Sequence, residues 1–462
     1  MFRILKKILL FTGIGIFLLL LILPAPAGLG RPAQNALAVF SLCVSLWATN
    51  VLPMSITGLI AIAAIPLFNI AEGKTTFSHF GNSAVFFILG AFILATAMMK
   101  SGLSKRLAIV FLRQFDRSAN TLAIGILLTS FFLAFWMPEH AVASLLFPIV
   151  LEISKSLDLK PHRSNYAKIL FLSLAWGTVI GGVCTFLGGA RNPLAIGMLK
   201  ESYDLNIGFL EWMIAVVPVV LILLLFAYIV INMFFKKEIK SIDSASESLS
   251  DSVRKMGAFS RNELKVAIIV VVTIAAWIFL NKQLDIAVIA LLSAISLFVF
   301  RAVTWKDIER YINWGIILMY GGAVTLGSTL AETGAMDWFA RKIFSYVSLT
   351  PFSAVTVLSL LSKFMTEGIS NVAAVATLIP LGFGIADTLQ INPIIIVQVI
   401  AIQSGLAFCL PIGTPPNAIA YSSGYFSISD FVKGGIILNI LAILIFLIIG
   451  LNYWNLIGIN IQ

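Results

Sequence analysis

The amino-acid sequence predicts an all-α, polytopic membrane protein with about eleven transmembrane helices, arranged as two inverted repeats. The first observation behind this prediction is composition, because 60% of the residues are hydrophobic, only 11% are charged and the mean hydropathy is +1.01. A folded domain in water could not cover that much apolar surface, whereas a bilayer is itself an apolar solvent. The second observation is a set of long uncharged runs, and the third is a duplication of the whole pattern.

Several apolar runs reach, alone or with their flanks, the length that crosses roughly 30 Å of hydrocarbon. The clearest runs cover residues 8–23, 213–235, 266–280 and 434–451. The net charge of +10 fits an excess of lysine and arginine in cytoplasmic loops, and it therefore argues against nucleic acid as a partner. We expect a multi-pass protein of the cell inner (cytoplasmic) membrane, with its N-terminus inside and the lipid bilayer as its solvent.

The duplication is visible as landmarks that recur at a nearly constant spacing. The paired landmarks are Trp47 and Trp277, Gly90 and Gly322, Pro148 and Pro380, and the segments 188–193 and 413–418. Their offsets are 230, 232, 232 and 225 positions. A repeated unit of this length indicates an internal duplication of the fold.

The predicted organisation has four parts. These are an extra N-terminal transmembrane helix at 1–34, a first repeat at 35–235, a cytoplasmic linker at 236–264 and a second repeat at 265–462. Each repeat contains a re-entrant hairpin, at 119–155 and 351–388, and a broken helix, at 166–199 and 392–424. Basic residues flank both ends of the first hairpin, so both ends are expected on the cytoplasmic side. Five true crossings then remain in each repeat, and an odd number inverts the second repeat relative to the first. The first helix resembles a signal peptide, but in a polytopic chain it is interpreted as uncleaved.

Four interruptions of helix at membrane depth are the candidate site. The two hairpin tips lie at 136–141 and 366–372, and the two helix breaks lie at 188–193 and 413–417. Broken backbone in a membrane persists where it lines a cavity, because its freed polar groups need partners. Glycine and proline break the helices, Asn, Ser and Thr offer hydrogen bonds, and helix N-termini offer amides to an anion.

The segment 413–420, Gly-Thr-Pro-Pro-Asn-Ala-Ile-Ala, with Ser370 and Asn371 upstream, resembles the divalent anion/sodium symporter family, whose INDY-like members carry dicarboxylates. The resemblance covers the whole chain. It implies a homodimer in which each protomer has a scaffold domain and a transport domain that moves as an elevator. It also implies that the two hairpin tips, normally Ser-Asn-Thr, hold the carboxylates of a small dianionic substrate, with sodium ions beside the helix breaks.

The family resemblance and the four helix interruptions together predict which residues of this sequence bind substrate. The expected substrate-binding residues are Glu139, His140, Arg191, Asn192, Ser370, Asn371, Val372, Thr414, Pro415 and Asn417. A residual sodium site is expected at Thr366, Asn371 and Gly413. The expected substrate is a C4 or C5 dicarboxylate such as succinate, malate, fumarate or 2-oxoglutarate.

The chain departs from the family pattern at its first tip and break. The first tip has Pro-Glu-His at 138–140, Arg191 lies in the first break, and Val372 replaces the threonine of the second tip. We expect that His140, Arg191 and Lys363 replace bound cations, because an ionisable residue at membrane depth is costly and is a functional candidate. Since a fixed arginine cannot leave with the substrate, the sequence favours a sodium-independent exchanger that crosses only when loaded.

Alternatives stay open at this point. Glu139 could neutralise Arg191 as a structural pair, or serve proton coupling, and Glu367 is interpreted as stabilising its hairpin. A sodium- or proton-coupled symporter of dicarboxylate, citrate or sulfate is the main rival, and an anion channel is a weaker one because no charge ring is evident. No enzyme, cofactor or metal site is expected, since two of the three histidines, His79 and His162, fall in predicted solvated loops.

Overall fold

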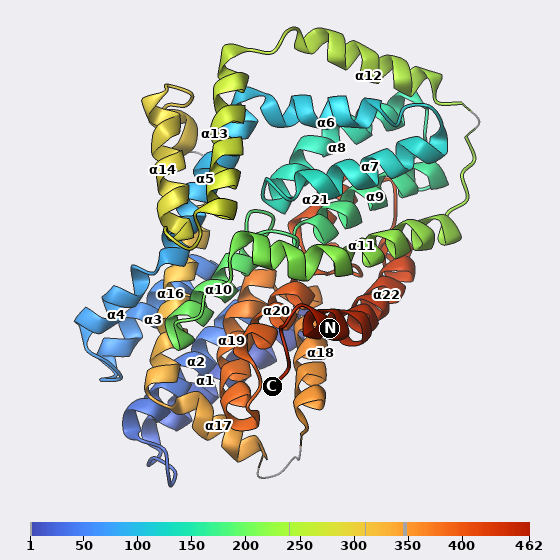
Figure 1. Ribbon diagram of the computed structural model, residues 1–462. Coiled ribbons are helices and arrows are strands. Elements are labelled where there is room, and N and C mark those ends of the chain that lie inside the picture. The colour runs from blue at the N-terminus through green and yellow to red at the C-terminus, as the bar shows by residue number, and fades with distance from the viewer. Residues whose placement is uncertain (1, 240, 310, 345–348) are drawn as a thin grey trace.

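The computed structural model describes residues 2–239, 241–309, 311–344 and 349–462, and every regular element within these ranges is a helix (Figure 1). The all-α prediction is therefore confirmed for the described part of the chain. Residues 1, 240, 310 and 345–348 belong to the predicted N-terminal helix, linker and second repeat, and they lie outside the described residues.

The first half of the chain begins with single helices. These are α1 (Phe2–Ile22), α2 (Arg31–Thr49), α3 (Met54–Leu67), α4 (Gly73–Phe80), α5 (Ser83–Ser101) and α6 (Leu103–Arg113). A helical hairpin, a broken helix and a long helix follow. They are α7 (Ala119–Leu133) with α8 (Glu139–Ser156), α9 (Asn165–Gly181) with α10 (Arg191–Tyr203), and α11 (Phe209–Phe234).

The second half shows the same order of elements after the short helix α12 (Asp243–Met256). Its single helices are α13 (Arg261–Phe279), α14 (Ile286–Val299), α15 (Trp305–Glu309), α16 (Trp314–Glu332) and α17 (Ala335–Phe344). The hairpin is α18 (Pro351–Gly368) with α19 (Asn371–Leu389), and the broken helix is α20 (Pro393–Gly405) with α21 (Pro415–Tyr421). The chain ends in α22 (Ile428–Leu444), a π-helix (Ile445–Gly450) and α23 (Leu451–Leu456).

Length and composition make this a multi-pass membrane protein. Among the described residues, six helical segments are long and apolar enough to cross a bilayer, and shorter apolar helices accompany them. Small residues let these helices approach closely, as between α3 and α16, where a Cβ added to Gly322 would overlap the backbone of Gly58. In lipid, apolar side chains are not driven together by exclusion from water. Helices therefore associate mainly through the van der Waals contacts that such close packing provides.

The two hairpins begin with the same local signal. Ser118 and Thr121 form a capping box at the start of α7, and Thr350 and Ser353 form one at the start of α18. Each box satisfies amide groups that the first helical turn leaves free. The repeated cap agrees with the duplication read from the sequence.

The polar segment predicted as a linker is partly helical. Figure 1 shows α12 crossing the top of the molecule above α6. The hydroxyls of Ser246 and Ser248 donate to the carboxylates of Asp116 and Glu152, over 3.0 and 2.9 Å, and tie α12 to the first half. The linker is thus docked on the helices rather than extended away from them.

Candidate functional site

Both hairpin tips and both helix breaks line one cavity of about 700 Å³. The tips contribute 138–140 and 368–372, and the breaks contribute 188–191 and 412–415. The opposite wall includes Trp47, Asn50, Ser55 and Asn313 from α2, α3 and α16 or their flanks. No motif pointed to this wall, because its residues lie near ordinary helix ends and reach the cavity only by packing.

Arg191 is the charged centre of the first half of the site. It is the first residue of α10, its residue is 1% exposed, and its Nη1 donates to Glu139 Oε2 over 3.0 Å. A guanidinium at a helix N-terminus meets the positive end of the helix dipole, so it needs a nearby anion. Glu139 supplies this anion from the first turn of α8, where a carboxylate is itself favourable. The structural pair weighed as an alternative in the sequence is therefore present.

Glycines make the space that the guanidinium occupies. A Cβ on Gly189 would lie 2.5 Å from Nη1, and a Cβ on Gly405 would overlap Nε. Gly182 likewise leaves space for the carboxylate, since a Cβ added there would lie 2.6 Å from Glu139 Oε2. Within the described chain, Nε and Nη2 of Arg191 are buried and have no hydrogen-bond partner.

Asn371 connects Arg191 to the second hairpin tip. Its carboxamide nitrogen is oriented toward Thr366 Oγ1 (2.6 Å), Gly413 O (3.1 Å) and Ser404 O (3.2 Å), because an oxygen there would face only acceptors. Its oxygen then accepts from Arg191 Nη1 over 3.2 Å. The residues predicted as a residual sodium site are thus brought together, with an amide nitrogen between their oxygens.

Lys363 and Glu367 organise the second break. The Lys363 ammonium donates to the carbonyl of Leu406, directly after α20 ends, and lies 4.8 Å from the centre of the Phe408 ring. Glu367 accepts the backbone N–H groups of Phe408, Cys409 and Leu410 over 2.9, 3.0 and 3.0 Å. This geometry agrees with the hairpin-stabilising interpretation of Glu367, and it buries Lys363, whose residue is 2% exposed.

Asn192 and Asn417 act on the backbone of the breaks rather than on the cavity. The Asn192 amide donates to the carbonyl of Thr185 over 2.7 Å, and the Asn417 amide donates to the carbonyl of Ala407 over 2.9 Å. Both side chains are fully buried, and neither lines the cavity. Each asparagine thereby satisfies carbonyls that the break leaves without a helical partner.

The remaining predicted residues face the cavity in different ways. His140 is exposed there, and Val372 and Pro415 form part of its wall. Ser370 lines it while its Oγ accepts the Ala373 N–H as the N-cap of α19. Thr414 also lines it, and its buried Oγ1 has no hydrogen-bond partner in the described structure.

Comparisons with known proteins agree with this architecture. The family described as "Sodium:sulfate symporter transmembrane region" matches residues 5–460. The sodium-dependent dicarboxylate transporter SdcS of Staphylococcus saprophyticus is 26% identical over 95% of this chain and 90% of its own length. SdcS of Staphylococcus aureus strain USA300 is 27% identical over 98% of this chain and 92% of its own length.

Two solved transporters share the fold at low sequence identity. MtrF of Neisseria gonorrhoeae aligns with a TM-score of 0.57 at 14% identity, over 94% of this chain and 97% of that one. YdaH of Alcanivorax borkumensis also has a TM-score of 0.57, at 12% identity over 93% of this chain and 99% of that one. With the family match over nearly its whole length, the chain is a membrane transporter and not an enzyme, and it belongs to the sodium:sulfate symporter family.

Proposed function

We propose that this chain carries C4 or C5 dicarboxylates such as succinate, malate, fumarate or 2-oxoglutarate. The names of its relatives support the substrate class. The observation that carries the proposal is the single cavity faced by both hairpin tips, because two tips can hold two separated carboxylates. Ser370, Arg191 and the N-terminal amides of α8 and α19 are the proposed donors.

We propose further that transport does not need sodium. Carbonyls at the C-terminal ends of half-helices are the groups that bind sodium in many secondary transporters. Here the Lys363 ammonium takes the Leu406 carbonyl, and the Asn371 amide nitrogen lies among the oxygens of Thr366, Ser404 and Gly413. Fixed side-chain nitrogens thus satisfy oxygens that a cation would otherwise bind.

Exchange is the proposed mode of transport. The ion pair with Glu139 compensates the charge of Arg191, so an uncompensated arginine does not account for exchange. The support is instead two buried nitrogens of Arg191, Nε and Nη2, that have no hydrogen-bond partner in the described residues. Each such donor costs about 1–3 kcal/mol, and a bound carboxylate would lower that cost. A loaded site would therefore cross the bilayer more easily than an empty one.

The moving unit proposed here comprises the hairpins and broken helices, in an elevator-type homodimer of the cytoplasmic membrane with the N-terminus inside. Its support is that α8 packs on α9 and α21, while α18 and α19 pack on α20. The hairpins and broken helices hold Glu139, Arg191 and Lys363, so they can carry these charges as one body.

A sodium-coupled symporter is the second candidate, favoured by the names of the relatives, which make sodium a reasonable co-transported ion. In that case Thr366, Asn371 and Gly413 would bind the ion after the Asn371 carboxamide rotates. Proton coupling through Glu139 is a further variant of symport. Both variants predict net uptake without a counter-substrate.

Counterflow in proteoliposomes tests these proposals. Vesicles holding unlabelled succinate are given labelled succinate outside, with either sodium or choline as the external cation, and empty vesicles run in parallel. Exchange predicts uptake only into loaded vesicles and equal rates in both cations. Sodium-driven or proton-driven accumulation in empty vesicles would contradict it. Citrate and sulfate, used as competitors, check the substrate class.

A further inference from the structure

Helix α10 connects the cavity to a second cluster of charges. It starts with Arg191 at the site and carries Lys200 and Glu201 near its other end, and the helical rise between Arg191 and Glu201 is about 15 Å. The loop that follows, residues 204–208, contains no lysine or arginine, which is typical of a loop on the outer side of the membrane. Any movement of the site that involves α10 must therefore also move Lys200 and Glu201.

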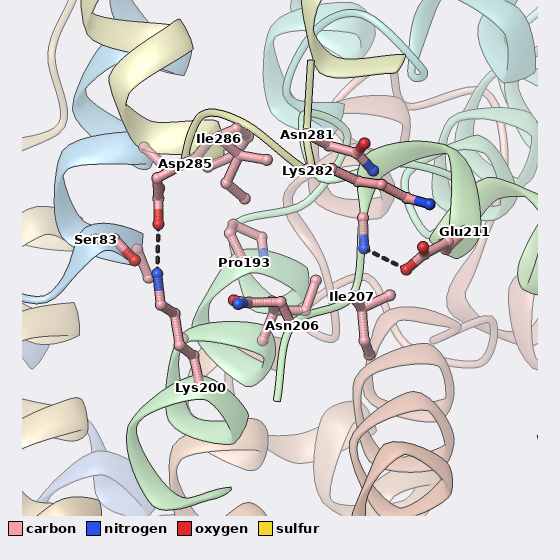
Figure 2. Close-up of a pocket in the computed structure, with 15 residues that line it drawn as sticks. Ser83, Pro193, Lys200, Asn206, Ile207, Glu211, Asn281, Lys282, Asp285 and Ile286 are labelled. Atoms are coloured by element: carbon pink, nitrogen blue, oxygen red, sulfur yellow. Dashed lines mark hydrogen bonds and ion pairs between the residues drawn. The ribbon is translucent and has the colours of Figure 1, made fainter. Parts of the chain in front are cut away.

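Lys200 joins α10 to the turn between α13 and α14. Its ammonium pairs with the carboxylate of Asp285, and the two side chains are 30% and 27% exposed. Figure 2 shows this pair on one side of a crevice, with Asn281 and Lys282 on the same turn. The crevice has a volume of about 340 Å³, so side chains do not fill the boundary between these elements.

Glu201 joins α10 to α4 and to the residue before α5, and through His79 to α16. Its carboxylate pairs with His79 Nδ1 of α4 over 2.9 Å and accepts from Asn82 Nδ2, before α5, over 2.5 Å. His79 Nε2 in turn lies 3.2 Å from Glu332 Oε1 of α16. The prediction of His79 as a solvated loop residue was wrong, because it is 8% exposed between two carboxylates.

Beneath these pairs, α10 meets α5 through small residues. A Cβ added to Gly197 would overlap Ala84, so the two helices touch almost backbone to backbone. Such close packing gains van der Waals energy, but it presents no polar group that would fix the position of α10 against α5. The charged pairs are thus the specific attachments of this end of α10.

We propose that Lys200 and Glu201, with Asp285, His79 and Asn82, form an outer latch that must release before the cavity can open to the outer side. The inference rests on the proposed carrier function, since a carrier must expose its site to both sides in turn. It assigns Lys200 and Glu201 as positioning residues that act through the conformation of α10, not through contact with substrate.

Thiol labelling tests the latch without any substrate. In a variant without the three native cysteines, Ile196→Cys places a thiol on α10 that lines the crevice and is buried. Adding Glu201→Gln and Asp285→Asn should raise its labelling by an external, membrane-impermeant maleimide about tenfold, equivalent to about 1.4 kcal/mol. The control pair Glu72→Gln and Asp204→Asn removes two exposed charges and should leave the rate unchanged. Equal labelling in the test and control variants overturns the latch.

A cross-link provides the functional arm. Lys200→Cys with Asp285→Cys, joined by a bifunctional methanethiosulfonate cross-linker that spans the space left by the two side chains, should lower succinate counterflow at least tenfold, and reduction should restore it. The control cross-link, Arg106→Cys with Glu263→Cys, replaces an ion pair between α6 and α13 and should leave counterflow unaffected. Counterflow that survives the first cross-link overturns the latch. Absent counterflow before cross-linking would instead contradict the proposed substrate, while the labelling result would still decide on the latch.

Discussion

The two helix breaks hold their charges in opposite ways. In the first half, the basic Arg191 meets the acidic Glu139 directly, over 3.0 Å. In the second half, Lys363 bonds to a carbonyl and Glu367 bonds to three consecutive backbone N–H groups. The asparagines that follow, Asn192 and Asn417, by contrast have the same role in both breaks.

This difference indicates which charged side chains need each other as partners for their burial to be stable. Removing one member of a buried ion pair leaves the other without compensation, which is far more costly than replacing both. A charge held by backbone dipoles keeps its partners when a neighbouring charge is removed. Substituting either charged residue of the first break should therefore disrupt the other as well. In the second break, each substitution should affect only the contacts of the residue that is replaced.

The largest effect is expected from Arg191→Met, which leaves the Glu139 carboxylate buried without its partner. The loss of a buried partner costs about 3–5 kcal/mol of unfolding free energy. Thermal unfolding in detergent and succinate counterflow measure the change, and counterflow should be lost.

The double variant Glu139→Gln with Arg191→Met is the matched control. It should recover most of the stability but not the transport, because the proposed substrate donor is still missing. An Arg191→Met protein as stable as wild type would contradict the interdependence of this pair.

Glu367→Gln should have the next largest effect. A neutral amide weakens the bonds to Phe408, Cys409 and Leu410, and its NH₂ group faces N–H donors. We expect a loss of about 2–3 kcal/mol in unfolding free energy. Glu247→Gln, at an exposed position of α12, is the control and should change stability little. Equal melting temperatures for the two variants would rule out an anchoring role for Glu367.

Lys363→Ala should destabilise less, by about 1–2 kcal/mol, because Glu367 keeps its backbone partners. The substitution frees the Leu406 carbonyl and opens space for a cation. Counterflow should fall and become stimulated by sodium, whereas the exposed control Lys160→Ala should stay insensitive. A Lys363→Ala protein with wild-type rates in both sodium and choline would remove Lys363 from the proposed cation replacement.

The smallest effect is expected from Val372→Thr, which restores the hydroxyl that the family pattern has at this position. One neutral hydrogen bond contributes about 0.5–1.5 kcal/mol, so the KM for succinate should fall roughly threefold. Val51→Thr, an exposed position outside the cavity wall, is the control. An unchanged KM would show that the second tip does not contact substrate at this residue.

Local pattern was enough to predict the elements of the fold and part of the site. Apolar length predicted the spans, and Gly, Pro and Asn clusters predicted the tips and breaks within a few residues of α8, α10, α19 and α21. The prediction that the tips and breaks line a cavity followed from their place at membrane depth, where freed backbone groups need partners. The direction of individual side chains did not follow, as Asn192 and Asn417 demonstrate by turning to the backbone.

By itself, the sequence determined a duplicated, all-helical membrane transporter with four polar interruptions, since hydrophobic length, helix breakers and repeats are properties of short segments. Only the tertiary structure decided that Glu139 neutralises Arg191, that Lys363 lies on the end of α20, and that His79 is buried between carboxylates. Each of these facts depends on groups at least 43 positions apart in the sequence meeting in space. Helical periodicity says which face a side chain is on, but packing chooses its partner.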